Sequence, residues 1–389
     1  MRFRGFTDEW EQVKFEEMLD KNDGVRRGPF GSALKKEIFV ENSDYVVYEQ
    51  QNAIYDNYKT RYNITKEKFD ELHKFTLKEN DFIMSGAGTI GRISRVPKGI
   101  KKGVFNQALI RFRINSELTN SEYFLQFVRA ENMQRKLTGA NPGSAISNLV
   151  PMSEVKKWEV FVPIKGEQQK IGELFQTLDN VIDLSNTQVE NLKQQKKALL
   201  QRLFPQKGET EPKVRLRGFT DDWEEVKLLD EIEVYQPKSL PQSKFLDEGY
   251  PVYGANGMIG YYDEYNHENR QIAMACRGNT AGVVNIIPEQ SYITGNAMIM
   301  DVYTNNKLDF NFMGQLFNNF DFTPYISGSG QPQITRSALK GVYIHLPSLE
   351  EQQAIGELFQ SLDEQIRLAE DKVSQYEKLK QALLQRLFV

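Results

Sequence analysis

The chain has 389 residues, of which 40% are hydrophobic and 26% charged, a composition typical of a folded globular protein and not of a disordered or fibrous one. Its single cysteine, Cys276, excludes an intramolecular disulfide. No apolar leader and no run of roughly 18 apolar residues occurs, so we expect a cytoplasmic protein without a membrane anchor. The three histidines are far apart, which argues against a zinc site, and the net charge of -4 argues mildly against a nucleic-acid binder.

The chain contains an internal repeat. Residues 2–14 (RFRGFTDEWEQVK) return at 215–227 (RLRGFTDDWEEVK) with 10 of 13 positions identical, an offset of 213. Residues 167–176 (EQQKIGELFQ) return at 351–360 with 9 of 10 identical, and ALLQRLF occurs at both 198–204 and 382–388, each at an offset of 184. The second copy is therefore 29 residues shorter, and the loss falls between the opening motif and the later ones. These similarities indicate a tandem duplication whose middle parts diverged.

In chain order, the patterns predict an α+β protein of five parts. These are a first mixed α/β domain (1–165), a helix (166–204), a polar linker with two prolines (205–214), a second mixed α/β domain (215–348) and a second helix (349–389). The duplication predicts pseudo-twofold symmetry between the two halves.

Residues 86–91 of the first domain (GAGTIG) match the G-x-G-x-x-G pattern of dinucleotide-binding sites. The segment that follows alternates polar and apolar residues and ends in proline, which predicts a strand where a dinucleotide site needs a helix. The second copy, around residues 274–282, lacks the glycine spacing. We therefore expect a tight hairpin that needs glycine.

Acidic residues are absent from four stretches, at 82–116, 132–153, 270–288 and 322–349, and these stretches occupy matching places in the two domains. Lysine and arginine would neutralise phosphates there, and arginine, amide and hydroxyl side chains would read base edges. A solvated basic face or buried strands that merely lack acids is the alternative. The predicted DNA-contacting residues are Ser85, Gly88, Thr89, Arg92, Arg95, Lys98, Lys101, Lys102, Asn106, Gln107, Asn141 and Ser144 in the first domain, and Tyr253, Asn256, Arg277, Asn279, Thr280, Asn296, Ser329, Gln331, Gln333, Thr335 and Arg336 in the second.

Both helices carry a 3-4 alternation of apolar residues over about five heptads, which predicts a coiled-coil seam. The series are Phe175, Ile182, Val189, Lys196, Leu203 with Ile171, Leu178, Ser185, Leu192, Leu199, and Phe359, Ile366, Val373, Lys380, Leu387 with Ile355, Leu362, Ala369, Tyr376, Leu383. Lys196 and Lys380 interrupt the seam at equivalent points. We expect their stems to pack and their ammonium groups to reach water, with a role in register as the alternative.

The linker favours antiparallel helices. The linker reaches at most roughly 33 Å, whereas each helix is about 55 Å long. A parallel pair would need a linker that returns along the full length of the first helix, and this linker is too short for that. The two domains would then lie at opposite ends of the helix pair. They could contact one DNA duplex at two places that are more than one helical turn, about 34 Å, apart.

The helix openings are nearly identical, and most of their polar residues lie off the apolar seam. They are predicted to form two equal partner-binding surfaces, with capping and solubility as the alternative: Glu167, Gln168, Gln169, Glu173, Glu351, Gln352, Gln353 and Glu357. Gly172 and Gly356 cost a helix roughly 0.5–1 kcal/mol each, which close approach by another backbone would justify.

These features resemble the specificity subunits of type I restriction–modification systems over essentially the whole chain. The segments that carry the resemblance are residues 28–32 (GPFGS), 85–92 (SGAGTIGR), 253–257 (YGANG) with 259–261 (IGY), 329–335 (SGQPQIT), and the duplicated helix openings. The resemblance implies two target recognition domains, each reading half of a split site in double-stranded DNA, and helices that set the spacer and dock two modification subunits. It also implies that S-adenosylmethionine, ATP and magnesium belong to the modification and restriction subunits, so this chain is expected to bind no cofactor.

No catalytic site is predicted. The chain has no N-P-P-[FY] motif of an adenine methyltransferase and no G-x-x-x-x-G-K-[ST] loop of an ATP motor. The competing hypothesis is a non-DNA adaptor with two protein-binding heads on a coiled coil, which the acidic net charge favours and the basic, amide-rich stretches disfavour.

Overall fold

The computed structural model describes residues 2–29, 31–139, 151–295, 297–328 and 330–388, and it divides into two compact units. Unit 1 comprises Met1–Leu184 with Lys372–Val389, and unit 2 comprises Ser185–Asp371. Each unit thus holds one mixed domain together with part of each long helix. In the described part of the chain, no helix is both long and apolar enough to cross a membrane.

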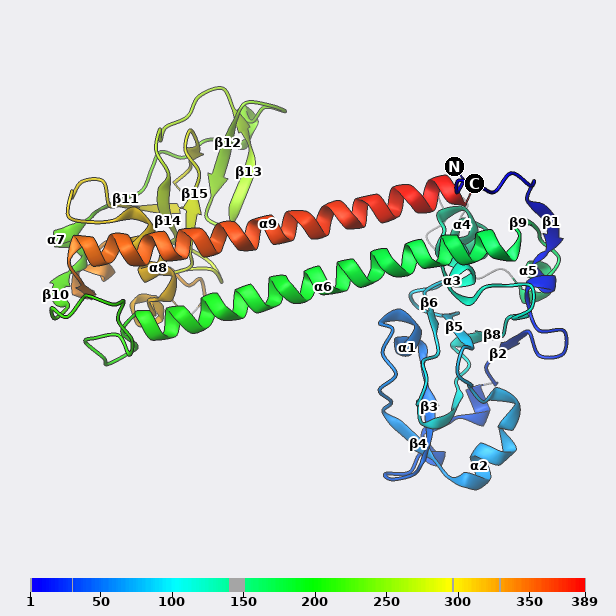
Figure 1. Ribbon diagram of the computed structural model, residues 1–389. Coiled ribbons are helices and arrows are strands. Elements are labelled where there is room, and N and C mark those ends of the chain that lie inside the picture. The colour runs from blue at the N-terminus through cyan, green and yellow to red at the C-terminus, as the bar shows by residue number, and fades with distance from the viewer. Residues whose placement is uncertain (1, 30, 140–150, 296, 329, 389) are drawn as a thin grey trace. The chain divides into compact units, whose positions relative to one another are not determined.

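Unit 1 is built on a four-stranded sheet, a three-stranded sheet and a two-stranded antiparallel sheet (Figure 1). A four-stranded antiparallel sheet has the order β2 (Val25–Arg27), β8 (Leu109–Phe112), β5 (Phe82–Ser85) and β6 (Ile93–Arg95). A three-stranded sheet has the order β4 (Tyr62–Ile64), β3 (Tyr45–Tyr48) and β7 (Lys102–Phe105), with β3 and β7 parallel. β1 (Glu11–Lys14) pairs with β9 (Glu159–Val162).

The core of unit 1 forms where the central strands β5 and β8 bury every residue. The ring of Phe124, on α3 (Ser121–Arg129), lies 4.9 Å from that of Phe82 and 6.0 Å from that of Phe112, so α3 packs on the four-stranded sheet. The other α-helices that the structure describes in this domain are α1 (Gln50–Ile54), α2 (Lys66–Glu71), α4 (Glu131–Thr138) and α5 (Met152–Val155).

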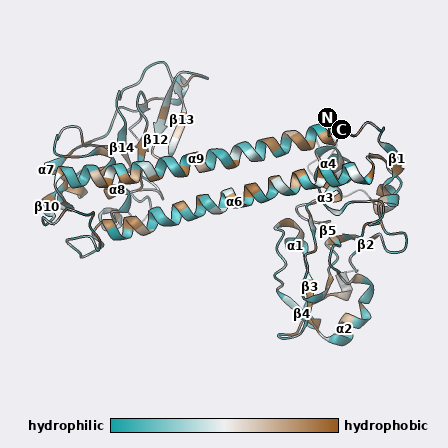
Figure 2. Ribbon diagram, viewed as in Figure 1, coloured by the Kyte–Doolittle hydropathy of each residue, from teal (hydrophilic) through white to brown (hydrophobic). Residues whose placement is uncertain are grey.

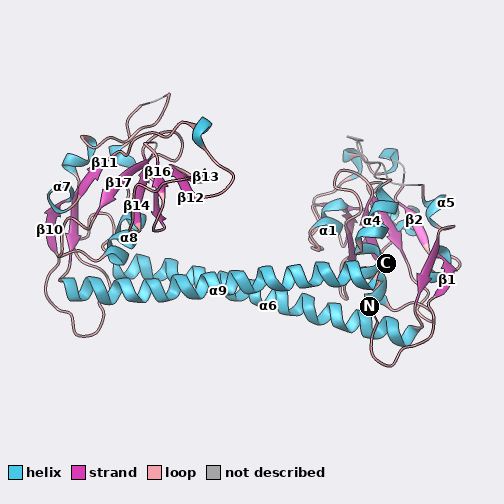
Figure 3. Cartoon of the chain, turned by 90° about the horizontal axis from the view of Figure 1, so that it is seen from above, coloured by secondary structure: helices cyan, strands magenta, loops and turns pink. Residues whose placement is uncertain are grey.

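Unit 2 repeats this topology (Figure 3). Its four-stranded sheet has the order β11 (Glu233–Tyr235), β17 (Ala297–Asp301), β14 (Gln271–Ala275) and β15 (Val284–Ile287). Its three-stranded sheet has the order β13 (Gly257–Tyr262), β12 (Tyr250–Gly254) and β16 (Tyr292–Ile293), and β10 (Glu224–Lys227) pairs with β18 (Tyr343–Leu346). Its α-helices are α7 (Leu228–Glu231) and α8 (Phe310–Asn319), and α8 takes the place of α3. The predicted tandem duplication is confirmed at the level of strand order.

The lengths of the two units differ mainly beside the three-stranded sheet. β5 begins 37 residues after the start of β3 (82 minus 45), whereas β14 begins 21 residues after the start of β12 (271 minus 250). The extra residues of unit 1 include α1 and α2. A separate core cluster around Leu34, Val47 and Ile64 forms there.

The long helices are α6 (Lys165–Leu203) and α9 (Leu349–Leu387). Within unit 1 the start of α6 lies beside the end of α9, with the rings of Phe175 and Phe388 6.0 Å apart. Within unit 2 the end of α6 lies beside the start of α9, with the rings of Phe204 and Phe359 5.9 Å apart. The helices therefore pair antiparallel in both units. Every predicted seam residue is buried or half-buried, and apolar residues recur along both helices in Figure 2.

The two seam lysines differ from the prediction. The Lys196 ammonium lies 2.6 Å from Asp363 Oδ1, and Asp363 Oδ2 accepts a hydrogen bond of 3.0 Å from Gln315 on α8. In unit 1, Lys380 pairs with Asp179, whose Oδ2 accepts a hydrogen bond of 3.2 Å from Gln126 on α3. The stems pack as expected, but the prediction that the ammonium groups simply reach water is wrong. Antiparallel pairing places an aspartate of the facing helix opposite each lysine.

The glycine-rich segment forms the predicted hairpin. β5 and β6 are antiparallel neighbours, and Gly88 and Gly91 in the connection have φ of +67° and +83°, which side chains of L-residues rarely adopt. The matching connection between β14 and β15 has Gly278 and Gly282 at φ of +79° and +86°. The prediction of a turn in place of a dinucleotide site is therefore confirmed.

Candidate nucleic-acid interface

Three connections meet at one edge of the four-stranded sheet of unit 1, where β2 and β5 end and β6 and β8 begin. They are residues 28–32 (without 30), 86–92 and 106–108, and we name them loop edge 1. The Gly28 amide donates to Leu109 O at 2.9 Å and the Gly86 amide donates to Ala108 O at 2.7 Å, so backbone bonds hold the connections together. A Cβ at position 28 would collide with the backbone of Asn106, which explains the glycine.

Five of the predicted DNA-contacting residues lie on loop edge 1. Gly88, Thr89, Arg92 and Gln107 are exposed, and Asn106 is half-buried. Ser85 contradicts the prediction, because its side chain is fully buried and bonded within the turn. Its hydroxyl donates to Thr89 O and accepts from the Arg92 amide at 3.0 Å. Ser85 therefore shapes the loop and does not contact a ligand.

The other predicted residues of unit 1 lie elsewhere. Arg95 is at the far end of β6, where its guanidinium is half-buried and lies 3.1 Å from a carboxylate oxygen of Glu122. Lys98, Lys101 and Lys102 follow β6 or begin β7 and are exposed. The structure thus separates the predicted set into loop edge 1 and a lysine-rich region at the opposite end of the strands. Asn141 and Ser144 lie outside the described residues.

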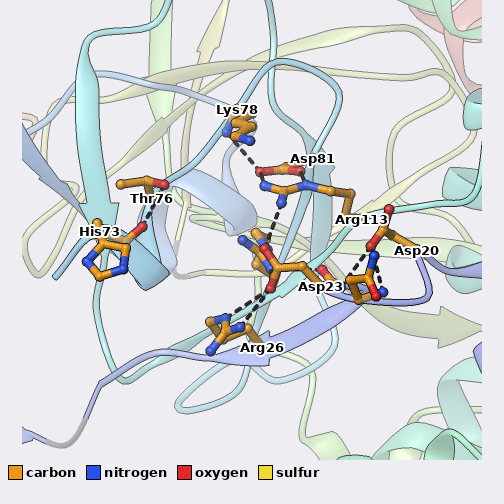
Figure 4. A network of polar contacts seen from close by, with 10 residues as sticks. Asp20, Asp23, Arg26, His73, Thr76, Lys78, Asp81 and Arg113 are labelled. Carbon is orange, nitrogen blue, oxygen red and sulfur yellow. Dashed lines mark hydrogen bonds and ion pairs between the residues drawn. The ribbon is translucent and has the colours of Figure 1, made fainter.

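Two arginines of the first acid-free stretch are not available to phosphates. Arg111 is 1% exposed and its guanidinium lies 2.5 Å from Asp23. Arg113 makes a bidentate pair with Asp81 (2.7 and 2.8 Å) and a third bond of 2.7 Å to Asp23, as Figure 4 shows. Burial would raise the pKa of Asp23, but hydrogen bonds from Arg111 and Arg26 outweigh it and hold the pKa below its ordinary value. The arginines here neutralise carboxylates that come from outside the stretch.

The equivalent place in unit 2, loop edge 2, is formed by residues 236–239, 276–283, 294–295 and 327–336, the last without 329. The Gly278 amide donates to Pro332 O at 2.8 Å and the Ile334 amide donates to Cys276 O at 3.0 Å, which brings the last segment against the β14–β15 connection. Thr280 donates to Asn256 Oδ1 at 2.6 Å, which joins the β12–β13 turn to the same edge.

Loop edge 2 contains most of the residues predicted for unit 2. Arg277, Gln333, Thr335 and Arg336 line one small groove of about 230 Å³. Arg277, Asn279, Asn256, Gln331, Gln333, Thr335 and Arg336 are exposed, and Thr280 and Tyr253 are half-buried. Asn296 and Ser329 lie outside the described residues.

Among the lining residues of this groove that sequence reasoning missed are Tyr235 and Gln236. Both stand at the end of β11, and Gln236 Nε2 lies 3.0 Å from Cys276 Sγ. The available signal was a polar residue that directly ends a strand pattern and precedes proline, at the same place in the repeat as Gly28.

The prediction that all eight polar residues of the helix openings face a partner is wrong for four of them. Glu167 and Glu351 are buried and form bidentate ion pairs with Arg2 and Arg215 of the repeated opening motif. Gln168 is also buried, where its oxygen accepts from the Asn120 amide at 2.9 Å.

In unit 2, the oxygen of Gln352 likewise accepts from the Asp309 amide at 3.1 Å. These side chains attach each helix to its own domain. Gln169, Glu173, Gln353 and Glu357 are exposed and remain candidates for partner contact.

The helix glycines lie against the same attachment points. A Cβ at Gly172 would approach the Tyr123 amide nitrogen to 3.1 Å, and a Cβ at Gly356 would approach the Phe312 amide nitrogen to 3.0 Å. The expected close approach by a backbone is confirmed, and that backbone is the start of α3 or α8 in the same unit.

Among the residues that the structure describes, no group of three or more histidine, cysteine, aspartate or glutamate side chains is placed to hold a metal ion. The cysteine, Cys276, is a buried residue of loop edge 2.

Comparison with known proteins matches both units to one family. The family model of the type I restriction modification DNA specificity domain matches residues 7–194 and again residues 220–378. The MjaX specificity subunit of Methanocaldococcus jannaschii, a putative type I restriction enzyme, is 24% identical over 349 residues, which cover 82% of this chain and 80% of that protein. The MjaVIII specificity subunit of the same organism is 23% identical over 317 residues, 74% of each chain.

Solved structures share the fold. The S subunit of a type I restriction-modification system from M. genitalium superposes with a TM-score of 0.65 at 16% identity, over 100% of this chain and 97% of that one. A chain from a study of the assembly and conformational transition of the type I R-M system superposes with a TM-score of 0.58 at 16% identity, over 99% of this chain and 98% of that chain.

Proposed function

The chain belongs to the family of type I restriction–modification DNA specificity subunits, and from this premise we propose that its two loop edges each read one half of a bipartite site in double-stranded DNA. The observation that carries the proposal is that the edges occupy the same topological place but present different side chains. Loop edge 1 exposes Thr89, Arg92 and Gln107, and loop edge 2 exposes Arg277, Gln331, Gln333 and Arg336. Arginine and amide groups form bidentate hydrogen bonds with guanine and adenine edges, so different sets would select different half-sites.

We assign α6 and α9 two roles in this proposal. Their antiparallel pairing sets the gap between the half-sites, and their exposed openings at Gln169, Glu173, Gln353 and Glu357 dock two modification subunits. Restriction subunits join in the full complex. The chain itself supplies recognition and no catalysis, and S-adenosylmethionine, ATP and magnesium bind to its partners.

Methylated adenines mapped across the host genome, with and without this gene, test the proposal. Loss of one split motif, two short half-sites with a fixed gap, supports it. The adaptor hypothesis predicts no lost motif and no salt-dependent binding of duplex by the assembled complex, because it makes no phosphate contacts.

The two half-sites should respond independently to substitution. We expect Arg92→Ala to weaken or relax recognition of the half-site read by unit 1, and Gln331→Ala to do the same for the half-site read by unit 2. Where a bidentate contact to a base is lost, discrimination against the wrong base should fall by about 1–3 kcal/mol. Methylation motifs of each variant provide the measurement. Lys66→Ala, on α2 and distant in sequence from loop edge 1, is the control expected to leave both half-sites intact. Equal loss at both half-sites in either variant would contradict independent reading.

The helices should set the gap. Seven residues inserted into the middle of both α6 and α9 keep the seam in phase and add about 10 Å, close to three base-pair steps of about 3.4 Å each. We expect the methylated motif to keep its half-sites and widen its gap by about three base pairs. An insertion in α6 alone is the control, because the Lys196–Asp363 and Lys380–Asp179 pairs cannot then both form, and the complex should lose activity. An unchanged gap in the variant with both insertions would contradict the proposal that the helices set the distance between the half-sites.

A further inference from the structure

Three lysines of unit 1 surround an open groove that lies away from loop edge 1. The groove has a volume of about 550 Å³ and is lined by Tyr58, Lys59, Thr60 and the segment 98–101, which contributes Lys98 and Lys101. No carboxylate lines it. We name it the lysine groove.

The lysines of this groove differ from three cations nearby in the sequence, which pair with carboxylates. Arg61 pairs with Glu49, Lys66 with Asp70 and Lys68 with Glu71. In the described part of the chain, no carboxylate oxygen lies within ion-pair distance of Lys59, Lys98 or Lys101, and all three side chains are exposed. Three unneutralised positive charges around one groove repel each other, which an anionic ligand would relieve.

The groove is held in shape by the fold. The Tyr58 hydroxyl bonds to Ser94 Oγ at 2.6 Å, which attaches one wall to β6. The Tyr48 hydroxyl donates to Lys101 O at 2.7 Å, which attaches the other wall to β3. Gly99 turns the chain between the two lysines with φ of +80°. The cations therefore stand on a fixed support.

The groove is within reach of a duplex on loop edge 1. β7 (Lys102–Phe105) runs from Lys101 at the groove to Asn106 at loop edge 1. Four residues of strand extend about 13 Å, which corresponds to about four base-pair steps of roughly 3.4 Å. A single DNA backbone could follow that path.

Unit 2 lacks this feature. The connection that matches 96–101 follows β15 and reads Pro288, Glu289, Gln290, Ser291, with a glutamate where unit 1 has lysine. The Gln290 amide donates to Glu268 O at 3.1 Å, which brings a second acidic residue to this place. The groove is a property of one unit only, so it is not required by the shared topology.

We propose that the lysine groove binds the phosphate backbone of DNA beside the half-site of unit 1, independently of base sequence, and so gives unit 1 a phosphate contact that unit 2 lacks. This proposal rests on the proposed function. Lysine suits the role because its ammonium is a flexible point charge that contacts phosphate without the geometry that base reading needs.

The test compares the wild-type chain, assembled with its modification subunits, with the variant Lys59→Gln/Lys98→Gln/Lys101→Gln. Binding of a duplex with the site and of one without it is measured across a series of salt concentrations. We expect affinity for both duplexes to fall by the same factor, and the slope of log K against log salt to become shallower by about 2–3, since each phosphate contact contributes about 0.9. The methylated motif should stay the same.

The matched control, Lys66→Gln/Lys68→Gln/Lys74→Gln, removes the same charge from α2 and the residues after it and should keep the wild-type slope. A wild-type slope in the groove variant overturns the inference and leaves the proposed function standing. Loss of modification-subunit association with an unchanged slope would make the groove a protein-docking surface and also overturns the inference. Absence of salt-dependent binding by the wild-type complex overturns both.

Discussion

Arg113→Ala should unfold unit 1 at much lower urea concentration than the wild type, with a loss of about 3 kcal/mol in the free energy of unfolding. The Asp81 side chain is 2% exposed and accepts two charge-assisted hydrogen bonds from the Arg113 guanidinium. Removal of one partner leaves a buried charge without compensation, which typically costs about 3–5 kcal/mol, and the remaining bond from the Lys78 amide offsets part of it. Urea unfolding followed by pulse proteolysis is the measurement. The protease cleaves the unfolded unit, and the fragments that survive show which unit is still folded.

Arg26→Ala is the matched control. Arg26 donates to the same Asp23 carboxylate but is 33% exposed, so its loss should cost at most about 1 kcal/mol. Equal effects of the two substitutions would contradict the role given to burial.

Acid should weaken the same network. Because the folded-state pKa of Asp23 lies below its ordinary value, its stabilising contribution is complete at neutral pH and is lost as pH falls through that lowered pKa.

Glu351→Ala should destabilise unit 2 by about 2–3 kcal/mol even without any partner protein. The Glu351 side chain is 1% exposed and holds Arg215 in a bidentate pair that joins the repeated opening motif to α9. Arg215 keeps 17% exposure, so water relieves part of the cost of its lost partner. Thermal unfolding of the chain alone is the measurement.

Glu357→Ala makes the matched comparison on the same helix. Glu357 is exposed, so its loss should leave the unfolding temperature unchanged and weaken association with a modification subunit in a pull-down. If Glu351→Ala were as stable as the wild type and impaired only in association, the prediction that Glu351 stabilises unit 2 through its buried ion pair would be wrong.

The repeated segments were readable from sequence because repetition and periodicity are local properties. The 3-4 alternation predicted α6 and α9, and the proline-terminated strand after residues 86–91 predicted the β5–β6 hairpin. The offsets of 213 and 184 placed the length difference between the units in the mixed domains. Each of these conclusions needs only the order of residues along the chain.

Side-chain partners could not be predicted in the same way, because they come from distant segments. Glu167 and Glu351 carry the pattern of exposed helix residues, yet an arginine 165 or 136 residues away buries them. Arg111 and Arg113 lie in an acid-free stretch. Their carboxylate partners come from outside it: Asp23 lies just before β2, and Asp81 lies just before β5.

The sequence by itself determined the duplication and the antiparallel helices, because repeats, heptads and linker length are properties of the order of residues. Its short motifs carried the resemblance to the family, and its local composition supplied the residue types of the candidate DNA surface. Only the tertiary structure decided which of the basic and amide residues are exposed and which are buried. Sheet pairing determines where the acidic residues lie relative to the basic ones. It divides the residues of one acid-free stretch among loop edge 1, the buried arginines and one wall of the lysine groove.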